Sequence, residues 1–100
     1  MNTGAFVPFF TFPDDAVWND ARSAVEFTVE VGEYKGRVVV ARRVFQALLP
    51  VPPLPERCLE AFHLDRIRFE RAAARKIERR ELTDDGNVEL SLKDLGGAQG

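Results

Sequence analysis

The most regular hydrophobic pattern in the chain is an alternation of apolar and polar residues from Ala24 to Val31. This alternation predicts a β-strand with one apolar and one polar face. Gly32 and Glu33 supply a reversal, and the segment from Tyr34 to Ala41 predicts the returning strand of a β-hairpin. Because this second strand contains three consecutive valines, 38–40, we expect it to be covered on both faces and to lie centrally in the sheet.

From Leu54 to Leu82 the pattern changes to a helical period, which predicts one long helix. Pro55 suits the first helical position, because its missing N–H costs nothing there. At about 100° per residue, one apolar stripe faces the core and consists of Cys58, Leu59, Phe62, Phe69, Ala73 and Ile77. Arg66 lies inside that stripe, so we expect its guanidinium to be paired with a carboxylate or a carbonyl group.

The length of this helix is itself a constraint on the fold. At ~1.5 Å per residue a continuous helix would be roughly 40 Å long. A domain of this size has a radius of gyration of only ~13 Å. The helix therefore either breaks near Leu64, or one of its ends projects from the molecule and meets a partner.

Shorter patterns complete the order of elements. The Phe- and Val-rich segment from Ala5 to Phe12 predicts a first strand, and its proline confines it to a sheet edge. Asp14 or Asp15 is expected to cap a short helical turn that carries Trp18. Residues 42–49 predict a short helix and 83–87 a turn. The last alternation predicts a short final strand that contains Val88, Leu90 and Leu92.

This order predicts an α+β fold. We expect a small, mainly antiparallel sheet, made of the N-terminal strand, the β-hairpin and the C-terminal strand, with a short helix and the one long helix covering one face. The chain is expected to form a single domain over residues 1–100, ordered from about 5 to 95, with a flexible tail at 96–100.

Composition limits the cellular compartments and the kinds of partner that we expect for this chain. The chain is 45% hydrophobic and 30% charged, as in ordinary soluble proteins, and its net charge of −2 lacks the basic excess of a dedicated nucleic-acid binder. Cys58 is the one cysteine, so no intrachain disulfide can form, which fits a reducing cytoplasm. The N-terminal apolar run is short and interrupted by Pro8, which argues against a signal peptide or a membrane span. We therefore expect a cytoplasmic protein without membrane contact.

Few residues in the sequence suggest catalysis. Cys58 and His63 are a conventional nucleophile and base, but five helical positions place them ~140° apart, so they cannot form a dyad. Cys58 is expected to be buried and inert, and His63 half-buried. The pairs Asp14-Asp15 and Asp84-Asp85 occur in turn sequences, where turn and cap roles are expected. We therefore expect no enzyme, no metal site and no cofactor, and only a weak case for a small-molecule site beside Trp18.

The long helix carries the candidate contact surface. Leu64 and Ile67 lie away from its core stripe, beside a row of arginines formed by Arg57, Arg68, Arg71, Arg75 and Arg79. The leading hypothesis is a non-enzymatic binding or adaptor domain that self-associates, as a homodimer, or docks a protein partner through Leu64, Ile67, Arg68 and Arg71. The simplest alternative is a solvated face with local pairs such as Asp65–Arg68 and Arg75–Glu78. A further alternative is nucleic-acid binding through Arg68, Arg71, Arg75 and Arg79.

Several segments, taken together in order, resemble a known family. They are FPDDAVW at 12–18, the alternating strand with its Val31-Gly32 turn, VVVARRVFQAL at 38–48, the helix with Phe62, Arg66, Ala72-Ala73 and Lys76-Ile77, and DDGNVELSLKDL at 84–95. The chain resembles the small bacterial proteins of domain-of-unknown-function family 1488 from Phe12 to Leu95. The resemblance implies a compact α+β domain and a bacterial cytoplasmic protein, but no catalytic or ligand-binding residues. The PVPPLP bridge at 50–55 and the aromatic N-terminus depart from the family pattern.

Overall fold

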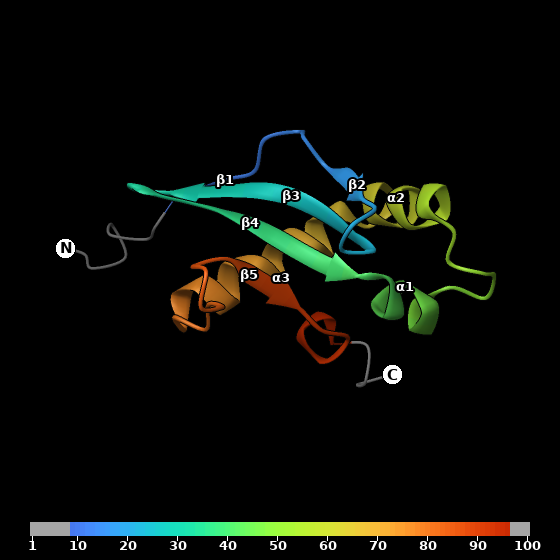
Figure 1. Cartoon of the computed structure of the whole chain (residues 1–100). Coiled ribbons are helices and arrows are strands. Elements are labelled where there is room, and N and C mark those ends of the chain that lie inside the picture. The colour runs from blue at the N-terminus through green and yellow to red at the C-terminus, as the bar shows by residue number, and fades with distance from the viewer. Residues whose placement is uncertain (1–8, 97–100) are drawn as a thin grey trace.

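A computed structural model of the chain describes residues 9–96, and Figure 1 shows its arrangement. In chain order the elements are β1 (Phe10–Thr11), β2 (Val17–Asn19), β3 (Ala24–Val31), β4 (Tyr34–Ala41), α1 (Arg42–Leu48), α2 (Pro55–Leu64), α3 (Arg66–Glu78), β5 (Val88–Leu90) and the 3-10 turn η2 (Lys93–Leu95). The predicted hairpin is confirmed at both strand boundaries, and the predicted short helix is confirmed as α1.

The sheet is open and mostly antiparallel. Its order is β1-β3-β4-β5, and β2 pairs with β3 beside β1. β1, β2 and β4 run antiparallel to β3, whereas β5 runs parallel to β4. β4 lies between β3 and β5, and valines 38–40 are all buried, so the expected central position of this strand is confirmed.

The hydrophobic core lies between one face of the sheet and the helices. α2 packs on β2 and β3, while α3 packs on β5 and η2, so the helices cover the same face (Figure 1). Aromatic rings dominate the contact, with Phe27 of β3 4.8 Å from Phe62 of α2 and Phe45 of α1 5.7 Å from Phe69 of α3, measured between ring centroids. Burying each such side chain stabilises the fold by roughly 1.5–3 kcal/mol. The α+β fold with one covered face is therefore confirmed.

The prediction of one long helix is wrong. The helix breaks at Asp65, whose φ of −130° and ψ of 35° are not helical, although its N–H still bonds to the carbonyls of Ala61 and Phe62. The break lets α2 follow β2 and β3 while α3 turns toward β5, and the radius of gyration is 13.9 Å. Of the two possibilities raised by the helix length, a break near Leu64 is the one observed. The second helix ends at Glu78, before the expected Leu82.

Two shorter predictions also need correction. Trp18 lies in strand β2 and not in a helical turn, because residues 17–19 pair with β3. The last strand stops at Leu90, and Leu92 leaves the sheet as the chain turns into η2. The first strand is seen at Phe10–Thr11, while its expected start at residues 5–8 and the expected tail at 97–100 lie outside the described residues.

Within residues 9–96, no helix combines the length and the apolar character that crossing a bilayer requires.

Candidate functional site

The break between α2 and α3 brings exposed apolar side chains to the surface. The side chain of Leu64, at the end of α2, is 82% exposed, and that of Ile67, in the first turn of α3, is 62% exposed. We call the surface formed by Leu48, Leu49, Ala61, Leu64, Asp65, Ile67 and Arg68 the helix-break surface. Burying two such apolar side chains would contribute roughly 1.5–3 kcal/mol each, so their exposure makes this surface a candidate contact site.

The surface is hollowed on both sides of Leu64. One hollow of about 410 Å³ is lined by His63, Leu64, Asp65, Arg66 and Ile67. The other, of about 240 Å³, lies between the end of α1 and the break, and is lined by Leu48, Leu49, Ala61, Leu64, Asp65, Arg68 and Phe69. Leu64 therefore projects between two depressions.

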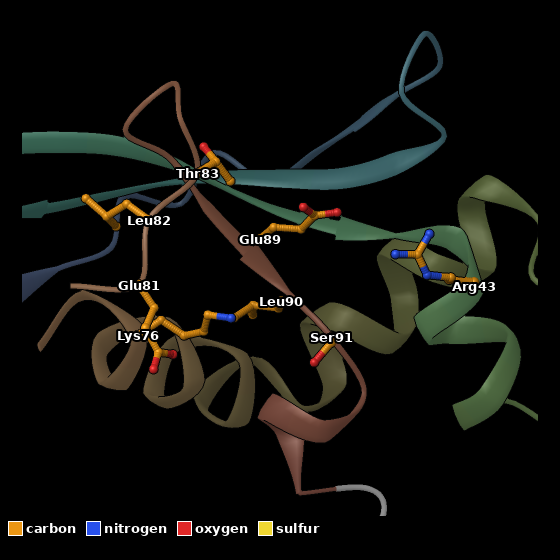
Figure 2. A pocket seen from close by; sticks show the side chains of 8 residues that line it. All are labelled: Arg43, Lys76, Glu81, Leu82, Thr83, Glu89, Leu90 and Ser91. Carbon is orange, nitrogen blue, oxygen red and sulfur yellow. The ribbon is translucent and has the colours of Figure 1, made fainter. Parts of the chain in front are cut away.

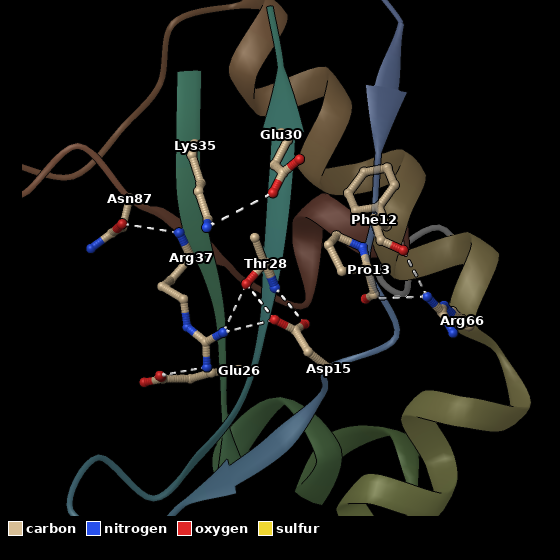
Figure 3. A network of polar contacts seen from close by, with 10 residues as sticks. All are labelled: Phe12, Pro13, Asp15, Glu26, Thr28, Glu30, Lys35, Arg37, Arg66 and Asn87. Carbon is tan, nitrogen blue, oxygen red and sulfur yellow. Dashed lines mark hydrogen bonds and ion pairs between the residues drawn. The ribbon is translucent and has the colours of Figure 1, made fainter. Parts of the chain in front are cut away.

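Arg66 fixes the geometry of the break. Its guanidinium donates to the carbonyl oxygens of Phe12 at 3.0 Å and Pro13 at 3.4 Å, and to the carboxylate of Asp14 at 3.1 Å. Figure 3 shows the contacts with Phe12 and Pro13. Glu70, one turn along α3, also binds it, and this bond is the main reason why the pKa of Arg66 is raised. The expected partners of Arg66 are therefore confirmed, and they tie the first turn of α3 to the segment between β1 and β2.

The predicted arginine row divides into engaged and exposed side chains. Arg68 donates to the Leu95 carbonyl at 2.9 Å and pairs with Asp65 at 3.3 Å. Arg75 donates to the Asp94 carbonyl at 3.0 Å. Arg71 and Arg79 are exposed, without an ion pair to the described part of the chain. The break also places Arg57 on the other helix, so the predicted row is not continuous.

The other residues considered for chemistry lie apart. Cys58 is fully buried, and burial raises the pKa of its thiol, so the expected buried cysteine is confirmed. His63 is exposed and not half-buried as expected. Trp18 donates from its ring N–H to Asp20, and Arg42 covers its ring at 5.3 Å. Among residues 9–96, no group of three or more His, Cys, Asp or Glu side chains is placed to hold a metal ion.

A polar network on the uncovered face of the sheet was missed by the sequence analysis. The Asp15 carboxylate accepts hydrogen bonds from the backbone N–H and the hydroxyl of Thr28, and Arg37 lies 3.3 Å from it (Figure 3). Arg37 also pairs with Glu26 at 3.5 Å. Glu26 and Thr28 are only 7% and 6% exposed, although their alternation suggested an open polar face.

The polar groups of this network bond to one another. Burial raises the pKa of Asp15, but the hydrogen bonds from Thr28 and the charge of Arg37 outweigh it, so the net pKa lies below its usual value. Within residues 9–96, no buried side-chain nitrogen or oxygen lacks a hydrogen-bond partner. The network therefore holds the segment before β2 against the sheet through bonds between protein groups. Asp15 and Arg37 are far apart in sequence, so no local motif indicates their contact. The one sequence signal for the network is the row of polar residues on β3.

Other hollows have strongly charged walls, among them one of about 380 Å³ that is lined in part by Arg75, Arg79 and Lys93. Figure 2 shows one of about 430 Å³, between β5, α3 and residues 81–83, lined by Arg43, Lys76, Glu81, Leu82, Thr83, Glu89, Leu90 and Ser91. Another, of about 600 Å³, lies over the uncovered face and has Arg22, Arg43, Asp84, Asp85 and Glu89 among its lining residues. None of these hollows brings together exposed apolar side chains as the helix-break surface does.

Comparison with known proteins identifies a family to which the chain is similar. A family model described as "Protein of unknown function (DUF1488)" matches residues 10–90. The crystal structure of a protein of unknown function from this family, from Shewanella loihica PV-4, superposes with a TM-score of 0.71 at 20% identity, over 82% of this chain and 91% of that one. At this identity the likeness establishes a shared fold. No curated protein matches the chain. The match over most of its length, together with the shared fold, shows that the chain belongs to the DUF1488 family of proteins of unknown function.

Proposed function

We propose that this chain is a non-enzymatic binding domain that docks a protein chain at the helix-break surface. The observation that carries the proposal is the pair of exposed apolar side chains, Leu64 and Ile67, on either side of the break. Protein interfaces typically combine an apolar centre with a polar rim in which arginine is frequent. Here the rim is supplied by Asp65 and Arg68.

The smaller of the two hollows beside Leu64, between the end of α1 and the break, suits protein side chains better than a small ligand. The apolar hollow beside Leu64 has a volume of about 240 Å³, below the roughly 300–1,000 Å³ typical of small-molecule sites. It has room for one or two protein side chains. The buried Cys58 and the exposed His63 support a non-enzymatic role, since burial disfavours the thiolate form of Cys58 and His63 lies on the surface. A free, buried cysteine also supports a reducing, cytoplasmic setting.

Nucleic-acid binding through Arg68, Arg71, Arg75 and Arg79 has less support. Two of these side chains, Arg68 and Arg75, already donate to backbone carbonyls near the C-terminal end of the fold. A phosphate backbone would have to compete with those bonds, and the net charge of −2 would oppose its approach. Protein docking is therefore the function that we propose.

Site-specific crosslinking in the cells that make this protein tests the proposal. A photoreactive residue at position 67 should give a protein adduct of one defined mass. The same residue at position 35 should give none, because Lys35 is equally accessible but lies on the uncovered face of the sheet. Adding Leu64→Glu should abolish the adduct. An adduct with nucleic acid, or the absence of any adduct from position 67, would refute the proposal.

A further inference from the structure

We infer that the occupant of the helix-break surface is a second copy of this chain, related by a two-fold axis, with Leu64 of each copy seated in the apolar hollow of the other. This inference rests on the proposed function and names its partner. A two-fold contact uses the same patch on both subunits, so the patch must be complementary to itself in shape and in charge.

The shape of the surface meets this requirement. Leu64 projects, and the hollow beside it is walled by Leu48, Leu49 and Ala61, with the buried ring of Phe69 lining its base. Projection and hollow are neighbours, so a two-fold axis between them places each projection over the opposite hollow. This is the knob-into-hole relation by which helices of separate chains pack.

The charges meet the same requirement. Asp65 and Arg68 both border the hollow and pair within the chain at 3.3 Å, with exposed side-chain fractions of 55% and 36%. Across a two-fold axis, Asp65 of one copy can face the Nη atoms of Arg68 of the other and the reverse, while the Nε of each Arg68 keeps its bond to the Leu95 carbonyl. A strongly acidic partner would be repelled by Asp65, and a strongly basic partner by Arg68. A second copy carries one charge of each sign, so each charge can face its opposite. The net charge of −2 adds little repulsion between copies.

The size of the surface is also adequate. A stable interface removes about 800 Å² from each partner, which is about one eighth of the 6466 Å² of accessible surface described for this chain. The exposed side chains of α2 before Leu64 are polar or charged and would form the polar part of the interface: Glu56, Arg57, Glu60 and His63. The outer faces of α2 and of the first turn of α3 can supply this area.

Sedimentation equilibrium of the purified full chain tests the inference. The wild type should show twice the chain mass of 11.3 kDa. Leu64→Glu should weaken the dimer by about 10- to 100-fold in Kd, as expected for a central interface residue. Val17→Glu is the matched control, because Val17 is also exposed, at 49%, but lies on β2, and this variant should remain dimeric. A monomeric wild type, or a dimer that Leu64→Glu does not weaken, would overturn the inference.

A charge exchange tests the two-fold arrangement itself. Asp65→Arg and Arg68→Asp should each dissociate the dimer, because each variant brings like charges together across the axis. An equimolar mixture of the two should form a heterodimer, and two monomers in that mixture would count against the arrangement. If the purified chain is a monomer while position 67 crosslinks another protein in cells, this inference fails and the proposed function stands. If position 67 gives no adduct, both fail.

Discussion

At the residue scale, a single glycine determines how β4 is joined to the loop before β5. The hydroxyl of Tyr34 donates to the Gly86 carbonyl at 2.7 Å, and its ring lies across Gly36, two residues along the same strand. A Cβ atom at position 36 would come 2.1 Å from the Tyr34 hydroxyl oxygen. Gly36 is therefore required for the close approach of the ring.

We predict that Gly36→Ala lowers the free energy of unfolding by about 1–3 kcal/mol, the usual cost of overpacking. In a Tyr34→Val background the same change should cost much less, because the ring that it displaces is gone. Urea unfolding of the four proteins measures this coupling. Equal costs in the two backgrounds would show that the clash with Tyr34 is not the cause.

Arg66 is the second residue on which the local geometry depends. We predict that Arg66→Met, which keeps the apolar stem, lowers the free energy of unfolding by about 1.5–3 kcal/mol, the range for hydrogen bonds to a charged group. Arg71→Met, at an exposed site on the same helix, should change it by no more than about 0.5 kcal/mol. Urea unfolding compares the two, and similar losses would mean that the contacts of Arg66 with Phe12 and Pro13 do not stabilise the fold.

At the element scale, β5 lies at one side of the sheet with its outer edge largely occupied. Alternate residues of a strand direct their N–H and C=O groups to opposite sides. The outward groups of Asn87 bond to Thr83, and those of Ser91 bond to Asp94. Within the described residues of β5 this leaves Glu89 as the residue whose backbone faces outward. The edge is thereby protected from pairing with another strand.

We predict that Asp94→Ala makes the protein more prone to aggregate, because it releases the outward N–H of Ser91 next to Glu89. It also removes the ion pair with Lys76, at 3.1 Å. Light scattering during heating should rise at a lower temperature than for the wild type. Asp84→Ala, which makes the same charge change in the exposed turn before β5, should behave like the wild type. If the two variants aggregate alike, the loss of charge explains the effect and the opened edge does not.

The elements that sequence predicted well are those determined by neighbouring residues. The hairpin follows from local alternation and a two-residue reversal. The helix break could not be predicted from neighbouring residues. Phe62 and Phe69 are seven positions apart, which at about 100° per residue is only about 20° short of two full turns. The apolar stripe therefore continues across Asp65 as it would in an unbroken helix. What accompanies the break is the contact of Arg66 with carbonyls more than fifty residues earlier in the chain.

In the candidate site, too, the local features were predicted from the sequence and those that depend on distant contacts were not. Leu64 and Ile67 lie off the core stripe in the sequence and are exposed in the structure. The hollow beside Leu64 was not predictable, since it needs α1 to end against the break. The Asp15 network was not predicted, because it also depends on residues that are distant in sequence. The Pro-Asp-Asp sequence resembles a helix start, but the Asp15 carboxylate binds Thr28 on β3. Contacts that are distant in sequence account for each of these misses.

At the scale of the whole molecule, two carboxylates join distant segments, and both have a lowered pKa. For Asp15 and Asp94 alike, burial raises the pKa, but hydrogen bonds outweigh it, from Thr28 in the first case and from Ser91 and Lys76 in the second. A lowered pKa in the folded state means that the folded protein binds protons less readily than the unfolded chain. Stability from these groups is therefore present above the unfolded pKa and is lost as pH falls through the folded value.

We predict that the free energy of unfolding stays nearly constant between pH 7 and about 5 and falls below about pH 4, where unfolded aspartates take up protons. The double variant Asp15→Asn, Asp94→Asn should be less stable at pH 7 and should lose less on acidification. Urea unfolding at a series of pH values measures both effects. An unchanged acid slope in the double variant would assign the acid sensitivity to other carboxylates.

The parallel pairing of β5 with β4 has a consequence for the order of folding. β3 and β4 meet across Gly32 and Glu33, whereas β5 reaches β4 only after the whole connection from Arg42 to Asn87. Closing the longer loop costs more chain entropy, so the hairpin should form early and β5 should dock late. During synthesis, the edge of β4 then stays uncovered until β5 has emerged, and for that interval the nascent chain is open to strand pairing with its neighbours.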